Sequence, residues 1–218
     1  MNKLEKLFYE SEHSSDKWNT YFDIYDRHLD KFYQKDIHFV EVGVQKGGSL
    51  DMWSKYFGFN STITGIDVDV ECTKLKYNKT NISVEIGDQG SATFWDNFLR
   101  GHQIDVFVDD GGHFMDQQIL TFEKVFPKLK VGGVYICEDC HTSYMPYNGG
   151  GLHVKSSFIE YAKGYIDTLH SFWHKELDTT QEHKNAIGKD LTGVVFYDSV
   201  VVFEKFGKRS MERVSSRN

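Results

Sequence analysis

The sequence predicts an α/β fold with a mostly parallel sheet of seven strands, helices on both faces and an antiparallel hairpin strand at the C-terminal end. Between residues 37 and 137, short β-branched and apolar runs alternate with segments whose apolar residues recur at helical spacing. After residue 190, two apolar runs follow each other around a tight turn at Asp198, which makes the last strand antiparallel. At 218 residues and 39% hydrophobic content, the chain is large enough to bury a substantial core.

Each predicted strand is a short apolar run bounded by turn residues. The predicted strands are His38–Val44, Thr62–Val68, Ile82–Ile86, Ile104–Asp109, Val134–Cys137, Gly193–Tyr197 and Ser199–Glu204. Helices are expected after Ser49 and after Ser91, because a serine hydroxyl can accept a hydrogen bond from an early backbone N–H of a helix. Further helical patterns run from Met115 to Phe126 and from Val154 to Leu169, with a turn at residues 130–133.

The chain divides into one large domain and two smaller segments. Residues 1–36 are expected to form a helical segment that packs on the core or caps it, because aromatic residues recur at helical spacing from Trp18 to Phe32. Residues 37–206 form the α/β domain, and residues 207–218 a flexible basic tail. Within the first segment, we expect a solvated Lys17 and a core Tyr21 rather than residues that line the mouth of a site.

Composition excludes several classes of function. A net charge of −7 argues against a nucleic-acid partner. No apolar run approaches the roughly 18 residues of a membrane span, and the N-terminus lacks the apolar core of a signal peptide, so we expect a cytoplasmic protein. Cys137 and Cys140 form a CxxC pair, but without a second pair they are expected to be small apolar residues at a buried strand end.

Three successive strand ends carry residues suited to a nucleoside. The first strand ends in EVGVQKGGS, where glycines let the backbone approach a ligand and the next helix offers free N–H groups. An acid at the end of the second strand can accept hydrogen bonds from ribose hydroxyls. A polar side chain at the end of the third could meet an adenine edge. The predicted cofactor-binding residues are Glu41, Gly43, Gly47, Ser49, Asp67, Asp88, Gln89 and Asp109.

The loop lacks the G-x-G-x-x-G fingerprint of dinucleotide-binding proteins. The carboxylate of Glu41 would also repel a pyrophosphate. S-adenosylmethionine (SAM) has a ribose, an adenine and an ammonium group but no phosphate, so SAM is the predicted cofactor. An NAD-dependent oxidoreductase remains an alternative that the missing fingerprint disfavours.

Acidic residues follow the fourth and fifth strands. Asp109 and Asp110 end the fourth strand, His113 follows three residues later, and Glu138 and Asp139 end the fifth. If the two strands are parallel neighbours, these side chains meet at the edge where open α/β sheets bind ligands. Carboxylates suit Mg²⁺ better than zinc, and a neutral histidine nearby can accept the proton of a hydroxyl.

The motifs VEVGVQKGGSLDMW, GIDVD, EIGDQ, VDDGGH, LKVGGVYICEDCHTSY and FYDSVVVFEK resemble class I SAM-dependent methyltransferases, and within that class the macrolide and tetracenomycin sugar O-methyltransferases. The matching stretches cover residues 38–205 in family order. The resemblance implies a Rossmann-like fold and an Mg²⁺ ion bound by Asp110, Glu138 and Asp139. It also implies that His113 acts as the general base in the catalytic site with Asp110.

The expected activity is therefore SAM- and Mg²⁺-dependent methylation of a sugar hydroxyl, on a nucleotide-sugar, a glycoside or a surface-polysaccharide precursor. A catechol-type O-methyltransferase and a non-catalytic SAM-binding subunit remain open alternatives. The resemblance and the aromatic N-terminal helices also suggest a homo-oligomer.

Overall fold

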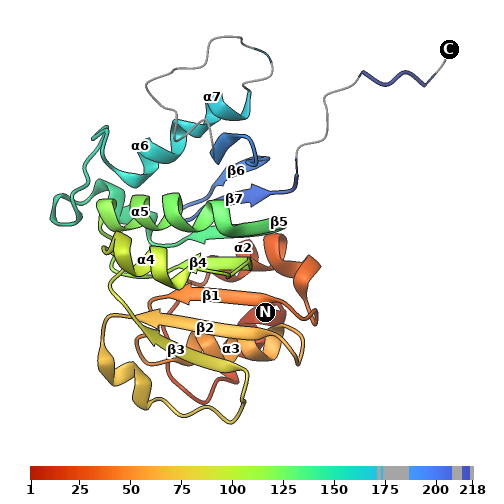
Figure 1. Ribbon diagram of the computed structural model, residues 1–218, viewed down its shortest axis with the longest axis vertical. Helices are drawn as coiled ribbons and strands as arrows, with labels where there is room; N and C mark the ends of the chain where they lie inside the picture. Colours follow the sequence, from red (N-terminus) through yellow and green to blue (C-terminus); the bar gives the residue numbers. More distant parts are fainter. Residues whose placement is uncertain (171–172, 174–186, 208–212, 217–218) are drawn as a thin grey trace.

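The computed structural model describes residues 1–170, 173, 187–207 and 213–216 (Figure 1). Within these residues, seven strands form one sheet in the order β3-β2-β1-β4-β5-β7-β6. Strands β1 to β5 are parallel, and β7 lies antiparallel between β5 and β6, which confirms the predicted fold class. The strands are β1 (His38–Val42), β2 (Thr62–Asp67), β3 (Ile82–Ile86), β4 (Ile104–Asp109), β5 (Leu129–Cys137), β6 (Gly193–Phe196) and β7 (Val201–Lys205).

Helices cover both faces of the sheet, as Figure 1 shows, and each face has its own hydrophobic core. Because successive side chains of a strand point to opposite faces, Val40 and Phe107 enter one core while Phe39 and Val106 enter the other. The α-helices are α1 (Lys3–Tyr9), α2 (Tyr21–Leu29), α3 (Gly48–Tyr56), α4 (Ala92–Phe98), α5 (Met115–Val125), α6 (Phe158–Lys163) and α7 (Tyr165–Leu169). No helix in the described ranges has the length and apolar character needed to cross a membrane.

The N-terminal segment packs on the face that carries α3. Leu4 of α1 and Tyr25 of α2 are fully buried in the same core as Trp53 of α3. Trp18, the first residue of the predicted aromatic stripe, lies before α2 and is 60% exposed. The stripe of α2 therefore belongs to the core, while the chain just before it crosses the edge of the sheet.

Three local predictions need correction. The helix predicted from Val154 to Leu169 is two short helices, α6 and α7, that divide at Gly164. The turn predicted at residues 130–133 lies inside β5 as an irregularity of its pairing with β4, where Gly132 has a φ of +96°. The N-cap of α3 is Gly47 rather than Ser49, whereas Ser91 caps α4 as predicted and accepts from Phe94 N–H at 3.2 Å.

Parts of two segments lie outside the described residues. Residues 174–192, a polar stretch of the sequence with no clear period, are described only from residue 187 onward. Of the basic tail at residues 207–218, residues 208–212 and 217–218 are likewise outside the described ranges.

Candidate active site at the carboxyl edge of the sheet

A cavity of about 830 Å³ opens at the carboxyl ends of the parallel strands. Residues that follow β1, β2, β3, β4 and β5 line it, together with residues 15–18 of the N-terminal segment. Of the predicted cofactor-binding residues, those on the wall are Gly43, Ser49, Asp67, Asp88 and Gln89. Glu41, Gly47 and Asp109 are not among the lining residues.

The loop after β1 is shaped by close contacts between backbones. Gly43 has a φ of +100°, and a Cβ at this position would clash with the carbonyl oxygen of Asp110. Asp67 fixes the next two residues, because its Oδ2 accepts from the N–H groups of Val44 and Gln45, both at 2.9 Å. Asp67 therefore orders the loop, and its carboxylate still borders the cavity.

Glu41 lies behind the wall and is fully buried. Its carboxylate accepts from the Ser49 hydroxyl at 2.5 Å and from Trp53 Nε1 at 3.3 Å. Burial raises the pKa of Glu41 to about 7, against the opposing effect of Lys17. The Ser49 hydroxyl therefore donates to the buried Glu41 carboxylate and does not cap α3.

Asp109 and Gln89 form a second buried pair beneath the cavity. Gln89 Nε2 donates to Asp109 Oδ1 at 2.7 Å, and the N–H of Gly112 donates to Gln89 Oε1 at 3.0 Å. Asp109 also accepts from the Tyr135 hydroxyl at 3.0 Å, while burial raises its pKa to about 7. These bonds hold the loop that follows β4. Asp88 is exposed, and its side chain accepts from the N–H of Gly90.

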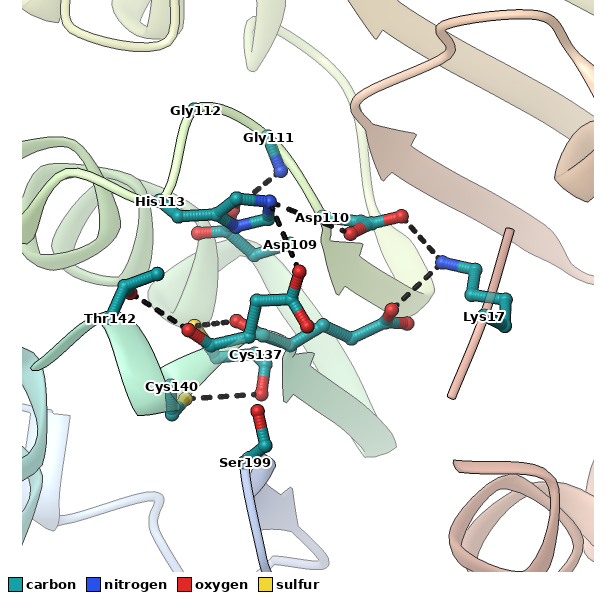
Figure 2. Close-up of polar contacts among 12 residues, drawn as sticks. Lys17, Asp109, Asp110, Gly111, Gly112, His113, Cys137, Cys140, Thr142 and Ser199 are labelled. Atoms are coloured by element: carbon teal, nitrogen blue, oxygen red, sulfur yellow. Dashed lines mark hydrogen bonds and ion pairs between the residues drawn. The ribbon is translucent and has the colours of Figure 1, made fainter. Parts of the chain in front are cut away.

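The structure brings Asp110, His113 and Asp139 together at the ends of β4 and β5. Figure 2 shows His113 and Asp110 in this group. One ligand atom from each lies within 4.8 Å of the others. His113 Nε2 is 3.4 Å from Asp139 Oδ2 and 3.9 Å from Asp110 Oδ1. Among the described residues, His113 Nδ1 is buried and has no hydrogen-bond partner.

Both His113 and Asp139 have left-handed backbones, with φ values of 57° and 50°. Such conformations cost roughly 1–3 kcal/mol for a residue with a side chain, and they concentrate at functional sites. Here they turn the two side chains toward each other across the gap between neighbouring strands.

Glu138, the third predicted metal ligand, is fully buried and already paired. Its Oε2 accepts from Lys17 Nζ at 2.8 Å and its Oε1 from the Tyr25 hydroxyl at 2.5 Å. Lys17 also donates to Asp110 Oδ2 at 2.5 Å, and its side chain is only 2% exposed. The expectation of a solvated Lys17 is wrong, because its ammonium is the counter-charge of a buried acidic cluster.

Tyr21 is buried as expected, but its hydroxyl belongs to the site. It donates to Asp139 Oδ1 at 2.6 Å and lies 2.8 Å from the Ser199 hydroxyl, which also lies 2.6 Å from His141 Nδ1. Sequence reasoning missed Tyr25 and Ser199 altogether. The available signal was that the buried stripe of α2 carries tyrosines at spacing i, i+4, where phenylalanine would serve packing alone.

The CxxC pair behaves as predicted. Cys137 and Cys140 are buried free thiols, and each donates weakly to a neighbouring backbone carbonyl.

Comparisons with known proteins identify relatives of this chain. An 8-demethyl-8-alpha-L-rhamnosyl tetracenomycin-C 2'-O-methyltransferase of Streptomyces olivaceus is 31% identical over 169 residues, which are 72% of this chain and 44% of that protein. Mycinamicin VI 2''-O-methyltransferase of Micromonospora griseorubida is 28% identical over 193 residues, which are 83% of this chain and 47% of that protein. The chain is a relative of these sugar O-methyltransferases.

A solved structure supports the same relationship. MycE methyltransferase from the mycinamycin biosynthetic pathway, in complex with Mg, SAH and mycinamycin VI, superposes with a TM-score of 0.80 at 25% identity. The alignment covers 99% of this chain and 57% of MycE. The fold is thus the Rossmann-like class I methyltransferase fold that the sequence predicted. The chain spans about half the length of the curated relatives that it matches, and no protein-family profile matches it.

Proposed function

We propose that this protein is a SAM- and Mg²⁺-dependent O-methyltransferase that methylates a sugar hydroxyl on a glycosylated small molecule, a nucleotide-sugar or a polysaccharide precursor. The observation that carries the proposal is the cluster of Asp110, His113 and Asp139 on the wall of the same cavity as Gly43 and Asp67. A group that can activate a hydroxyl then lies beside a pocket that can hold a methyl donor. The sugar O-methyltransferases to which the chain is related support the acceptor class.

The residues present fit a magnesium ion. Asp110 and Asp139 offer hard oxygen donors from adjacent strands, partly exposed to a cavity that can admit an acceptor. Bound there, Mg²⁺ would polarise the acceptor hydroxyl and favour loss of its proton. Glu138 is kept as the third proposed ligand, with its carboxylate shared with Lys17 and Tyr25.

His113 is the proposed general base. Its Nε2 faces the gap between Asp110 and Asp139, where a hydroxyl would be held, and a neutral imidazole can accept a proton there. The carboxylate of Asp139 would stabilise the imidazolium that results. Elsewhere on the cavity wall, Asp67, Asp88 and Gln89 are the proposed partners of the SAM nucleoside.

The activity is tested with SAM labelled in its methyl group. The acceptors are a panel of rhamnosides and other glycosides, nucleotide-sugars, and catechols, each with Mg²⁺ and with EDTA. We expect transfer to a sugar hydroxyl that EDTA abolishes and Mg²⁺ restores. Transfer to catechols alone would identify a catechol-type enzyme, and SAM binding without transfer to any acceptor would favour a non-catalytic subunit. Binding of NAD in place of SAM would indicate an oxidoreductase.

The role of His113 is tested with His113→Asn, because asparagine tolerates the left-handed backbone at this position better than alanine does. We expect kcat to fall by roughly 10²–10⁴-fold while SAM affinity is retained. His141→Ala is the matched control, since His141 also lies 3.9 Å from Asp139, but its Nδ1 is 2.6 Å from the Ser199 hydroxyl. Near-normal turnover by His113→Asn would remove His113 from the mechanism.

A further inference from the structure

Lys17 is the least expected residue of the site, because its ammonium lies among the acidic cluster of Glu41, Asp110 and Glu138. It comes from the segment before α2, outside the sheet, yet its ammonium is buried among carboxylates from three strand ends. Figure 2 shows its pairing with Asp110. Its Nζ lies 2.5 Å from Asp110 Oδ2, 2.8 Å from Glu138 Oε2 and 3.8 Å from Glu41 Oε1.

The chain before Lys17 is fastened to the first α/β unit. The N–H of Glu12 donates to Asp51 Oδ2 at 2.7 Å, and the N–H of Gly48 donates to the carbonyl of Ser14 at 3.2 Å. A Cβ on Gly48 would press against the backbone of Ser14, so the segment lies close on the start of α3. These contacts hold the segment against α3, and the ion pairs with Asp110 and Glu138 hold the Lys17 ammonium in the site.

The two oxygens of the Asp110 carboxylate have different neighbours. Oδ2 accepts from the ammonium, which leaves Oδ1 turned toward His113 at 3.9 Å. The geometry thus places one ammonium group among three carboxylates.

We propose that Lys17 is a positioning residue that limits how strongly the acidic cluster binds a divalent cation and thereby keeps that cation reactive. The inference rests on the proposed function. The ammonium of Lys17 repels the divalent cation. It also partly neutralises the carboxylates of Asp110 and Glu138, so both become weaker oxygen ligands of that cation. A cation that these carboxylates neutralise less retains more charge with which to acidify the acceptor hydroxyl.

Removal of the ammonium should consequently change two quantities in opposite directions. In Lys17→Met, Asp110 and Glu138 are free to bind a cation with their full charge, so affinity should rise at least about 10-fold. At saturating cation, kcat should fall by a similar factor, because the hydroxyl is less acidified and the orientation of Asp110 is lost. Simple structural damage would lower affinity and kcat together.

The experiment measures Mn²⁺ binding by electron paramagnetic resonance on the full chain without SAM or acceptor, and then kcat at saturating Mn²⁺ or Mg²⁺. Lys17→Arg, which retains the charge, should stay close to the wild-type protein in Mn²⁺ affinity. Lys17→Gln keeps a hydrogen-bond donor without the charge, so it should reproduce Lys17→Met and serves where Lys17→Met does not fold. Asp51→Ala is the matched control, because it loosens the segment at Glu12 and leaves the ammonium in place; its Mn²⁺ affinity should be unchanged.

Equal or weaker Mn²⁺ binding by both neutral variants, with normal binding by the wild-type protein, would overturn the inference alone. A wild-type protein that binds Mn²⁺ but transfers no methyl group overturns the proposed function and removes the catalytic half of the inference. Tighter Mn²⁺ binding with reduced kcat in the neutral variants supports both.

Discussion

At the scale of single residues, the site depends on a few positions that tolerate no substitute. Gly43 combines a positive φ with a backbone approach to the Asp110 carbonyl, so both its conformation and its lack of a side chain are required. The end of β1 also holds the backbone of Asp110 in place, because the N–H of Asp110 donates to the carbonyl of Val42 at 3.0 Å. The first strand end and the metal-binding candidate are therefore one structural unit.

Gly43→Ala should destabilise the protein by roughly 3 kcal/mol or more and abolish methyl transfer, since the Asp110 backbone must move. Gly101→Ala is the matched control. Gly101 also has a positive φ, of +75°, but no heavy atom of the described residues lies within 4 Å of its Cβ position. It should cost only about 1 kcal/mol of backbone strain and keep full activity. Urea unfolding and the methyl-transfer assay measure both, and equal costs would contradict the close approach.

Asp109 predicts a pH dependence of stability. Burial raises its pKa from 3.8 to about 7, so the folded state binds a proton more tightly than the unfolded chain. The stability from the neutral carboxyl is complete below pH 3.8 and is lost as the pH rises through about 7, a loss of at most about 4 kcal/mol. Asp109→Asn cannot titrate, so its unfolding free energy should lack this decline between pH 4 and 7. Parallel pH profiles for the two proteins would show that the carboxyl is ionised throughout.

At the scale of elements, α2 does more than fill the core. Tyr21, Tyr25 and His28 follow at spacing i, i+4, i+7 and lie along one face. Their polar ends reach Asp139, Glu138 and Glu204 in that order. One helical face therefore fixes the end of β5 and also contacts β7, which explains why tyrosines occupy buried positions.

Tyr25→Phe should lower the free energy of unfolding by about 1–3 kcal/mol, because the buried carboxylate of Glu138 loses a hydrogen-bond donor. Tyr56→Phe is the control. Tyr56 is equally buried, but its hydroxyl has no partner among the described residues, so the change should stay within about 0.5 kcal/mol. Denaturant unfolding separates the two, and a neutral Tyr25→Phe would show that the Glu138 carboxylate does not need this donor.

Element positions followed from the sequence where periodicity is strong. The five parallel strands and the hairpin lie where apolar runs predicted them. The pattern is strongest in the central strands β1 and β4, which must be apolar because they are buried. The errors fall where local rules compete with tertiary contacts. Ser49 has the residue type of a cap, but the buried carboxylate of Glu41 takes its hydroxyl. A bulge in β5 looks in sequence like a turn, because glycines serve both.

At the scale of the whole molecule, two cores hold the sheet between helical layers and leave its carboxyl edge open. Three aromatic residues of the helices expected to form an oligomer interface are instead buried within the chain, namely Tyr21, Phe22 and Tyr25. The homo-oligomer stays a prediction from the resemblance. The cytoplasmic location likewise stays a prediction from the sequence.

Mg²⁺ should stabilise the folded protein as a whole, because the cluster of Asp110, His113 and Asp139 exists only when β4 and β5 are paired. At a hundredfold excess over its dissociation constant, Mg²⁺ should add about 2.7 kcal/mol to the unfolding free energy. Asp139→Asn removes one charged ligand but tolerates the left-handed backbone, so most of the gain should vanish. Thermal unfolding with Mg²⁺ and with EDTA measures the difference, and an equal gain in both proteins would place the ion elsewhere.

The sequence by itself determined the α/β architecture, the strand ends and the acidic and histidine residues gathered there, because periodicity and chain order govern which strands become neighbours. Only the tertiary structure decided which of those acids are open to the cavity and which are already neutralised. Lys17 lies 93 residues from Asp110 and 121 residues from Glu138 along the chain. No local pattern encodes such a contact, since it arises from how the N-terminal segment packs across the finished sheet.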